Sequence, residues 1–354
     1  MLVLSDGKAG HVKQSLAVVE TLRQQHPAVS GRTVEIRYRH RLARLLTLVW
    51  SWAVPSGWGA ETCLRWALTP ESAAALLRSY ADLIVSCGSS TASVNALWSA
   101  DNRAKSVILM NPAPLPLSRF DLVIAPRHDR LPPRANVIAI DGAMTHTPEA
   151  DRLAQSAQRL RQHPNFRADA AAAGPVVALL IGGDTAEYVL TESWTAEMVR
   201  QITQACNAAQ GTCLATTSRR TSPAVERQLA EGLGRDARCR LLLLANRDAI
   251  NGTMEGLLGS AEAVVVTGES ISMVSEARAS GRPVIVVDVP RRRSSSRRDT
   301  KHARFLRDCA ARDGVCIVAV TGLAAAIAKA LKARQAPRSL EHLSAVRAAL
   351  ARLL

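Results

Sequence analysis

The sequence predicts an α/β protein of two domains, each with a parallel β-sheet that helices cover on both faces. Short, nearly continuous apolar runs rich in Val, Ile and Leu alternate with longer stretches of helical period, which is typical of buried parallel strands joined by helices. The alternation occurs twice, before and after an Ala-rich stretch at residues 168–175 that we interpret as a linker. A chain of 354 residues is long enough for two such cores.

The first half of the chain supplies the first series of elements. Leu16, Val19 and Leu22 recur on one face of an expected helix, which we expect to pack on the sheet. The expected strands are residues 2–4, 33–37, 82–86, 106–110, 121–125 and 136–140. The expected helices are residues 13–25, 71–80 and 89–100. Together they define a predicted amino-terminal domain, residues 1–167.

The second half repeats the series in a predicted domain of residues 175–335. Residues 336–354 are predicted to form a carboxyl-terminal helix that could cap either domain. The Arg/Ser run at residues 291–298 is expected to be a solvated loop. The expected strands are residues 176–181, 213–217, 240–244, 263–267, 283–288 and 315–319. The expected helices are residues 193–210, 223–231, 272–280 and 301–312.

Two successive units of this kind indicate twin Rossmann-like domains, and we expect their parallel sheets to face each other across a cleft that holds the ligand. Open parallel sheets bind their ligands at the carboxyl ends of the strands. The loops that directly follow strands are therefore the candidate binding elements.

The amino-acid composition limits which binding partners and which cellular compartment are expected. Lys and Arg number 45 against 30 Asp and Glu, a net charge of +15 that indicates an anionic partner: nucleic acid, acidic lipid or a phosphorylated substrate. Seven cysteines lack CxxC or zinc spacing, which favours buried thiols in a reducing compartment. The amino-terminal residues do not have the pattern of a signal peptide. The longest uncharged run, residues 45–60, is interrupted by Pro and Gly. We expect a cytoplasmic protein without a membrane-spanning helix.

The loop after the first strand is the first candidate site. Gly7 and Gly10 allow tight turns, and the free N–H groups where the helix begins attract polar or anionic oxygens, as does Lys8. His11 would stand at the mouth of the cleft, and histidine side chains can transfer protons near neutral pH, so it is the candidate general base. The alternative is a simple strand–helix turn whose histidine only caps the helix.

Two loops of the second domain also follow strands and carry residues suited to binding an anion. Gly182 and Gly183 form a glycine turn directly after a strand. Ser218, Arg219 and Arg220 follow the next strand, where hydroxyl and guanidinium groups suit a diphosphate because arginine binds phosphate in a bidentate manner. The alternative for this second loop is a solvent-facing basic turn.

The most specific stretch is residues 264–277. A buried strand ends at Gly268 and Glu269, and a helix follows. The N–H groups of Ser270 and Ser272 are candidates for phosphate contacts at that helix start. Glu276 can accept hydrogen bonds from both hydroxyls of a ribose. Otherwise Glu276 is an exposed helix residue.

An arginine-rich segment precedes four of the six tryptophans. Arg37, Arg39, Arg41 and Arg44 come before Trp50, Trp52, Trp58 and Trp66. Arginines followed by Trp and Leu are typical of a membrane-interface element. A core helix pair with a basic face is an equally good interpretation, and stacking on single-stranded nucleic acid is a third. No helix-turn-helix or zinc-finger spacing appears, so nucleic acid is not an expected partner.

Several common ligand motifs are absent from the sequence. No Asp-x-Asp follows a strand, so a metal-bridged diphosphate is not indicated. GxxxxGK[ST], an amino-terminal GxGxxG and the GxSxG elbow of serine hydrolases do not occur either. We therefore expect neither a bound metal nor a cofactor.

These loops resemble those of the GT-B glycosyltransferase superfamily, especially the lipid-intermediate N-acetylglucosaminyltransferase of peptidoglycan synthesis. The matching positions are Gly10, His11, residues 268–275, Glu276, Gly281 and Pro283. A similarity spanning most of the chain is to the ELM family, named for a plant mitochondrial fission protein, whose bacterial members are classed with the glycosyltransferases. The residues that carry it are 6–14, 125–129, 181–183, 217–221 and 266–277. This chain has Glu269 where the family usually has Asp, and Ile250-Asn251-Gly252 in place of Asn-Pro-Tyr.

The resemblance implies a metal-independent GT-B-like glycosyltransferase. The second domain would bind a nucleotide-diphosphate sugar, and the first would bind a cell-envelope glycan or lipid-linked acceptor. Gly7, Lys8 and Gly10 would contact that acceptor, and His11 would act as base. An anionic membrane surface is a candidate further partner, at the cytoplasmic face of the inner membrane. Two alternatives stay open: a nucleotide-sugar 2-epimerase of the same fold, and a non-catalytic membrane-associated scaffold.

Overall fold

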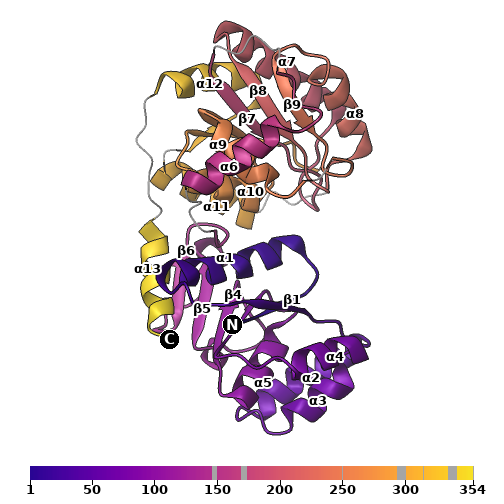
Figure 1. Cartoon of the computed structure of the whole chain (residues 1–354), viewed down its shortest axis with the longest axis vertical. Helices are drawn as coiled ribbons and strands as arrows, with labels where there is room; N and C mark the ends of the chain where they lie inside the picture. Colours follow the sequence, from indigo (N-terminus) through magenta and orange to yellow (C-terminus); the bar gives the residue numbers. More distant parts are fainter. Residues whose placement is uncertain are drawn as a thin grey trace. The chain divides into compact units, whose positions relative to one another are not determined.

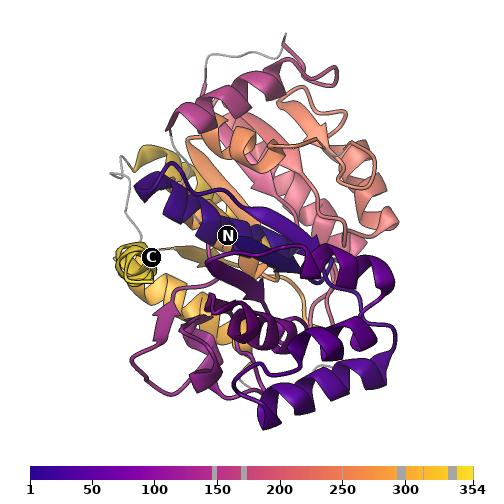
Figure 2. The same ribbon diagram turned by 60° about the horizontal axis from the view of Figure 1, so that its bottom comes forward.

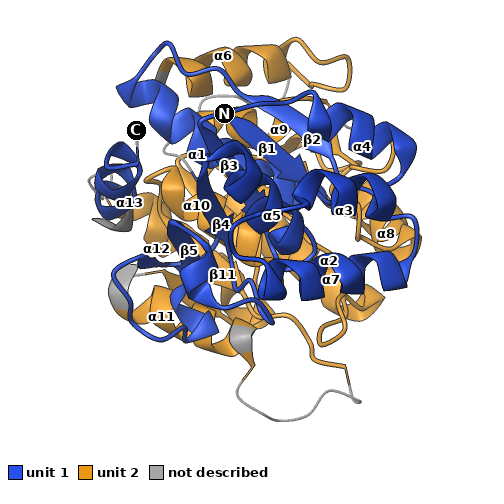
Figure 3. Ribbon diagram, turned by 90° about the horizontal axis from the view of Figure 1, so that it is seen from below, with its two compact units in different colours: residues 1–146, 340–354 blue, residues 147–339 orange. Residues whose placement is uncertain are grey.

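The structure is a computed structural model that describes residues 1–145, 150–168, 174–248, 250–292, 300–313, 315–333 and 341–353. The chain divides into two compact units: unit 1 comprises residues 1–146 and 340–354, and unit 2 comprises residues 147–339 (Figure 3). The described residues form two six-stranded sheets, and every strand pairs in parallel with its neighbours. The predicted α/β fold class is confirmed.

Unit 1 contains the sheet β2-β1-β3-β4-β5-β6 (Figure 1). Its strands are β1 (Leu2–Ser5), β2 (Arg32–Glu35), β3 (Leu83–Cys87), β4 (Lys105–Leu109), β5 (Leu122–Pro126) and β6 (Val137–Ile140). Its α-helices are α1 (Ala9–Gln25), α2 (Arg41–Ala53), α3 (Ala60–Ala67), α4 (Pro70–Leu77), α5 (Ala92–Asn102) and α13 (Glu341–Ala351). Two short 3-10 helices, Leu117–Arg119 and Arg127–Asp129, flank β5.

Helices cover both faces of this sheet. Leu83 and Val85 of β3 belong to a core cluster that contains Val346 of α13. Ile84, which lies between them, belongs to another cluster with Leu64 of α3. Because successive side chains of a strand point to opposite faces, the two clusters lie on opposite sides of the sheet.

Unit 2 contains the sheet β12-β11-β10-β7-β8-β9. Leu179 packs with Met198 of α7, whereas its neighbour Leu180 packs with Leu257 of α9, so helices again cover both faces (Figure 2). The strands are β7 (Val176–Leu180), β8 (Thr212–Thr216), β9 (Cys239–Leu243), β10 (Ala263–Thr267), β11 (Val284–Val287) and β12 (Cys316–Val318). The helices are α6 (Ala150–Arg161), α7 (Glu192–Ala208), α8 (Pro223–Gly232), α9 (Thr253–Ser260), α10 (Ile271–Ala279), α11 (Lys301–Asp313), α12 (Leu323–Lys332) and the 3-10 helix Val320–Gly322.

The units divide the chain at other positions than the predicted domains, 1–167 and 175–335. Helix α6 belongs to unit 2 because Leu160 joins the core cluster of α9. Helix α13 belongs to unit 1, where Val346 and Leu350 are fully buried. Most of the predicted linker at 168–175 and of the basic loop at 291–298 lies outside the described residues.

Several elements differ from the predictions in extent. Helix α1 begins at Ala9 rather than at residue 13, so Gly10 and His11 lie in its first turn. On this helix Leu22 is buried as expected, but Leu16 is 44% exposed. The arginine- and tryptophan-rich segment forms α2 and α3, and His40 caps α2 by accepting the N–H of Ala43. None of the helices in the described parts of the chain has the length and apolar composition needed to cross a bilayer.

Candidate functional site

Each sheet has one point where the strand order reverses. In unit 1 the chain passes from β1 to β2 on one side, and β3 lies on the other side of β1. In unit 2 strand β8 follows β7 on one side, and β10 lies on the other. Ligands of open parallel sheets bind outside the carboxyl ends of the strands at such switch points. The loops after β1 and β3, and those after β7 and β10, are therefore the candidate sites.

The unit 1 switch point holds a hydrogen-bonded histidine and aspartate. The Asp6 carboxylate, just after β1, accepts a hydrogen bond from Ser90 Oγ at 2.6 Å, in the loop after β3. The same oxygen lies 2.9 Å from Nδ1 of His11 and 3.1 Å from Nζ of Lys8. Two loops that are far apart in the sequence thus meet at one carboxylate.

These contacts keep Asp6 ionised and orient the His11 ring. Burial alone would raise the pKa of Asp6, but hydrogen bonds from Ser90 and Lys8 and the charge of His11 bring this pKa below its usual value. An ionised carboxylate only accepts hydrogen bonds, so Nδ1 of His11 is the donor. In the neutral ring Nε2 then carries the free lone pair. This is the form that a general base requires.

The surrounding backbone fits the imidazole closely. Gly88 has a φ of +79°, and a Cβ at this position would lie 2.9 Å from Cε1 of His11. Tyr38 donates its hydroxyl hydrogen to the Ser90 carbonyl oxygen at 3.1 Å, which fixes the loop after β3. Of the sequence-predicted residues, Gly7, Lys8 and Gly10 lie exposed beside this pair. Asp6 and Ser90 were not among the predicted site residues, although Asp6 lies five residues before His11.

The unit 2 switch point brings three predicted loops together. Gly182, directly after β7, donates its N–H to Oγ1 of Thr267 at 2.8 Å, at the end of β10. Gly183 donates its N–H to Oε1 of Glu269 at 2.9 Å. Thr221, in the loop after β8, donates its hydroxyl hydrogen to the Gly182 carbonyl oxygen at 2.5 Å. The glycine turn is therefore held from both neighbouring strands.

This close approach explains the glycine pair. A Cβ on Gly182 would lie 1.7 Å from Oε1 of Glu269, and one on Gly183 would lie 2.2 Å from the carbonyl carbon of Arg220. The Asp184 N–H also donates to the Arg220 carbonyl oxygen at 3.2 Å. Real Cβ atoms do not come this close to other heavy atoms, so the turn depends on residues without a side chain.

The basic loop after β8 presents its charges to solvent. Arg219 and Arg220 are exposed, and Ser218 is half-buried with its Oγ accepting the Arg220 N–H at 3.1 Å. Beneath the loop, Glu226 accepts hydrogen bonds from Thr217 Oγ1 at 3.3 Å and from Asn246 Nδ2 at 3.0 Å. The guanidinium groups therefore extend from an anchored loop at the carboxyl end of the sheet.

Glu269 is buried beneath the glycine turn, with 1% of its surface exposed. Burial raises the pKa of its carboxyl group, although hydrogen bonds from Thr267 and Gly183 oppose this effect. Within the described residues Oε2 has no hydrogen-bond partner. Its own carbonyl oxygen lies 2.6 Å from Nε2 of His302, whose pKa is lowered by burial. This placement makes Glu269 a support of the turn; a direct ligand contact stays a prediction.

The raised pKa of Glu269 predicts a pH-dependent stability. Its folded-state pKa exceeds that of the unfolded chain, so its contribution to the free energy of unfolding is lost as pH rises through the folded pKa. We expect the difference in unfolding free energy between wild type and Glu269→Gln to fall as pH rises from 5 to about 8. Urea denaturation at several pH values measures it.

Glu197→Gln is the control for this titration. Arg200 lowers the pKa of Glu197 to about 2 in the folded protein, so Glu197 is ionised in the folded state and mostly ionised in the unfolded chain over this pH range. The stability difference between wild type and Glu197→Gln should therefore stay constant. If the difference in unfolding free energy between wild type and Glu269→Gln also stayed constant with pH, this result would contradict a raised pKa of the buried Glu269 carboxyl group.

The loop after β10 leads into helix α10. Gly268 and Ser270 are buried, whereas Ser272 and Glu276 are half-buried on the first turns of the helix. In the described structure the Ser270 side chain makes no capping hydrogen bond to α10. Because the first N–H groups of any helix lack intrahelical partners, this end of α10 can donate to an oxyanion.

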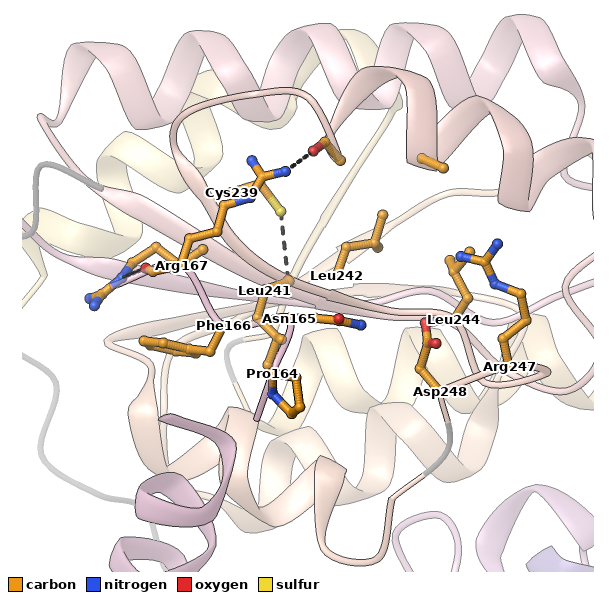
Figure 4. Close-up of a pocket in the computed structure, with 13 residues that line it drawn as sticks. Pro164, Asn165, Phe166, Arg167, Cys239, Leu241, Leu242, Leu244, Arg247 and Asp248 are labelled. Atoms are coloured by element: carbon orange, nitrogen blue, oxygen red, sulfur yellow. Dashed lines mark hydrogen bonds between the residues drawn. The ribbon is translucent and has the colours of Figure 1, made fainter. Parts of the chain in front are cut away.

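A pocket of about 390 Å³ lies elsewhere in unit 2, along the edge strand β9 (Figure 4). Phe166, Arg240, Leu242 and Asp248 are among the residues that line it. It contains none of the sequence-predicted site residues. Across the described residues no group of three or more His, Cys, Asp or Glu side chains is arranged to hold a metal ion.

Comparison with known proteins adds a family and a fold. The family model described as "Mitochondrial fission ELM1" matches residues 9–342. The mitochondrial fission protein ELM1 of Arabidopsis thaliana is 28% identical over an alignment of 232 positions, which covers 58% of this chain and 51% of that protein. The chain thus spans about half the length of the curated relative it matches.

Solved structures with the same fold bind or act on nucleotide sugars according to their descriptions. A candidate UDP-N-acetylglucosamine 2-epimerase from Listeria monocytogenes has a TM-score of 0.56 at 12% identity, over 99% of this chain and 95% of that one. The UDP-GlcNAc 2-epimerase from Neisseria meningitidis, bound to UDP-GlcNAc, has a TM-score of 0.50 at 13% identity, over 98% of each chain. At this identity the likeness shows the fold alone. It confirms the predicted GT-B type of two Rossmann-like units.

Proposed function

This chain belongs to the mitochondrial fission ELM1 family, and we propose that it is a glycosyltransferase acting on a nucleotide-diphosphate sugar. Its acceptor would be a cell-envelope glycan or a lipid-linked precursor. The observation that carries the proposal is the pairing of two chemistries at the two switch points. One has an oriented histidine base, and the other has a glycine turn beside exposed arginines.

The unit 2 switch point supplies the donor site. Arg219 and Arg220 can neutralise a diphosphate, and the uncapped start of α10 can donate N–H groups to its oxygens. The half-buried Glu276 is the candidate partner of the ribose hydroxyls. The buried contacts of Gly182 and Gly183 hold these loops in place before the ligand arrives, which lowers the cost of ordering them on binding.

The unit 1 switch point supplies the acceptor site and its base. Nε2 of His11 takes the proton of the acceptor hydroxyl, and the hydroxyl oxygen forms a bond to the anomeric carbon of the sugar. The bond from that carbon to the diphosphate oxygen breaks. Arg219 and the amino terminus of α10 then offset the charge that develops on the leaving group. The proposed reaction needs no divalent ion.

Binding of UDP is the first test of this proposal. We expect UDP to stabilise the protein by about 2–4 kcal/mol at 100 to 1,000 times its dissociation constant, with EDTA present. Arg219→Gln should weaken UDP binding about 10- to 100-fold, because a charged hydrogen bond to phosphate is lost. Thermal unfolding and calorimetric titration measure the two effects.

Arg235→Gln is the matched control for Arg219→Gln. Arg235 is also exposed in unit 2, but it precedes β9 and so lies toward the amino ends of the parallel strands. Arg235→Gln should therefore leave UDP binding unchanged. A thermal shift that appears only with Mg²⁺ or Mn²⁺ would contradict metal independence, and no shift with any nucleotide would favour the non-catalytic scaffold.

A nucleotide-sugar 2-epimerase is the second candidate, because the solved structures with TM-scores of 0.50 and 0.56 carry that description. Incubating the protein with UDP-GlcNAc in the absence of any acceptor separates the two reactions. An epimerase converts the sugar under these conditions, whereas a transferase leaves it unchanged until an acceptor is added. Chromatography of the sugar product distinguishes these outcomes.

A further inference from the structure

Helix α2 packs with its small and polar side chains inward. Ala43, Thr47 and Ser51, which recur every four residues, are fully buried. Thr47 Oγ1 lies 2.9 Å from Oγ of Ser93 on α5, beside which α2 lies (Figure 1). The fully buried side chains of α2 are therefore small or polar, while Leu48 and Trp50 pack against the core only in part.

Five large apolar side chains occupy the other side of α2. Each exposes between 47% and 67% of its surface, although such residues usually lie in the core. At 3.6 residues per turn they form one stripe opposite the buried one. We call this stripe the α2 apolar face; its residues are Leu42, Leu45, Leu46, Val49 and Trp52. Trp58, just before α3, and Trp66, on α3, are also more than half exposed.

The chemistry around the α2 apolar face is cationic. Residues 36–60 contain four arginines and neither Asp nor Glu. Arg41 and Arg44 lie in the first turn of α2 and are exposed. Arg39 donates its Nε–H to the Leu68 carbonyl oxygen at 2.8 Å, which holds its guanidinium beside the end of α3.

The apolar side chains and the arginines around them together indicate which kind of surface covers the α2 apolar face. A second copy of the chain would bring the same arginines and no carboxylate from this segment to pair with them. A bilayer of anionic phospholipid offers an apolar layer for Leu, Val and Trp and phosphates for the arginines, and tryptophan is enriched at that boundary. We infer that the α2 apolar face and Arg41 and Arg44 bind unit 1 reversibly to an anionic phospholipid surface.

Under the proposed function, unit 1 is also the unit that receives the acceptor. A lipid-linked acceptor would be presented at that same surface, and this part rests on the proposed function. The membrane contact itself requires no transferase activity. Binding to lipid and binding to nucleotide can therefore be measured separately.

Co-sedimentation with vesicles tests the inference. Wild type should sediment with vesicles of mixed phosphatidylglycerol and phosphatidylcholine at low salt and be released at high salt. Pure phosphatidylcholine vesicles should hold it poorly. Arg41→Gln and Arg44→Gln should each lower the partition constant about fivefold. The double variant Leu45→Ser/Val49→Ser should lower it at least tenfold, because two side chains that enter the bilayer are lost.

Leu16→Ser is the matched control, since Leu16 is an exposed leucine of α1 outside the α2 apolar face. It should sediment like wild type, and all variants should keep the UDP-induced thermal shift. Failure of wild type to bind anionic vesicles would overturn the inference. So would unchanged binding by Leu45→Ser/Val49→Ser, or a wild-type dimer that this variant dissociates. Vesicle binding without any nucleotide shift would overturn only the proposed function.

Discussion

Replacing His11 by alanine is expected to lower turnover about 10²- to 10⁴-fold, the usual contribution of a general base. Nucleotide binding should be unaffected because His11 lies in unit 1 and the proposed donor site lies in unit 2. The measurement is release of UDP from the sugar donor in the presence of a lipid extract as the acceptor source. UDP-induced thermal stabilisation of the same variant checks the donor site.

Asp6→Asn should cause a loss of similar size through a different physical route. An asparagine amide can donate to Nδ1 of His11 and so place the ring proton on Nε2, where it blocks base catalysis. His26→Ala is the control, because His26 is an exposed histidine at the other end of α1. Full turnover by Asp6→Asn would show that the carboxylate does not orient the base. Loss of UDP binding in His11→Ala would reverse the assignment of donor and acceptor units.

Gly183→Ala is expected to destabilise the protein by about 3 kcal/mol, at the upper end of the range for overpacking. The added Cβ would lie 2.2–2.4 Å from backbone atoms of Arg220 and Thr221. Backbone atoms cannot turn aside as a flexible side chain can, so the loops after β7 and β8 would separate. Urea denaturation measures the loss of stability, and UDP affinity should fall with it.

Gly10→Ala is the matched control for Gly183→Ala. Among the described residues, no heavy atom outside the helix's own backbone and the chain neighbours lies within 4 Å of a Cβ added at Gly10, which is in helix α1. Replacing a glycine in the middle of a helix by alanine raises stability by about 0.5–1 kcal/mol, and Gly10, the second residue of α1, should gain at most this amount. Two glycine substitutions should therefore change stability in opposite directions. Equal denaturation midpoints for Gly183→Ala and wild type would mean that the turn tolerates a side chain.

Most strands were predictable because they are short apolar runs bounded by polar residues, β2 (Arg32–Glu35) being an exception. Strand β10 coincides with its predicted range, and all five of its residues are buried. Helix boundaries were less predictable. Helix α1 starts after Lys8, which makes no capping hydrogen bond through its side chain, so the sequence lacks the usual Ser, Thr, Asp or Asn signal there. Helices α6, α9 and α12 were not predicted, and α9 contains two glycines.

The candidate site could be predicted as a set of loops but not as a geometry. The glycine turn and the loops after β8 and β10 were identified, and the parallel sheet brings them to one edge. The orientation of His11 depends on Asp6 and Ser90, and the last of these is 84 residues from Asp6. The burial of Glu269 likewise follows from a contact with Gly183 across 86 residues. Such long-range contacts leave no periodic signal in the sequence.

The predicted family is confirmed. The structure of the arginine-rich segment was predicted only in part. Its three sequence interpretations were a membrane-interface element, a core helix pair and a surface for stacking on single-stranded nucleic acid. The segment does form two helices, but α2 buries Ala43, Thr47 and Ser51 and leaves Leu42, Leu45 and Leu46 exposed. A helical pattern identifies an apolar face without saying whether protein or another phase covers it.

The packing of α13 on unit 1 has a consequence for biosynthesis. Val346 and Leu350 complete a core whose other residues come from the first 144 positions of the chain. The ribosome must therefore synthesise the whole of unit 2, residues 147–339, before α13 can complete the core of unit 1. At a synthesis rate of about 5–20 residues per second, this takes roughly 10–40 s. During that interval the nascent chain carries a partly uncovered apolar surface beside Leu83 and Val85, which is the kind of surface that chaperones bind.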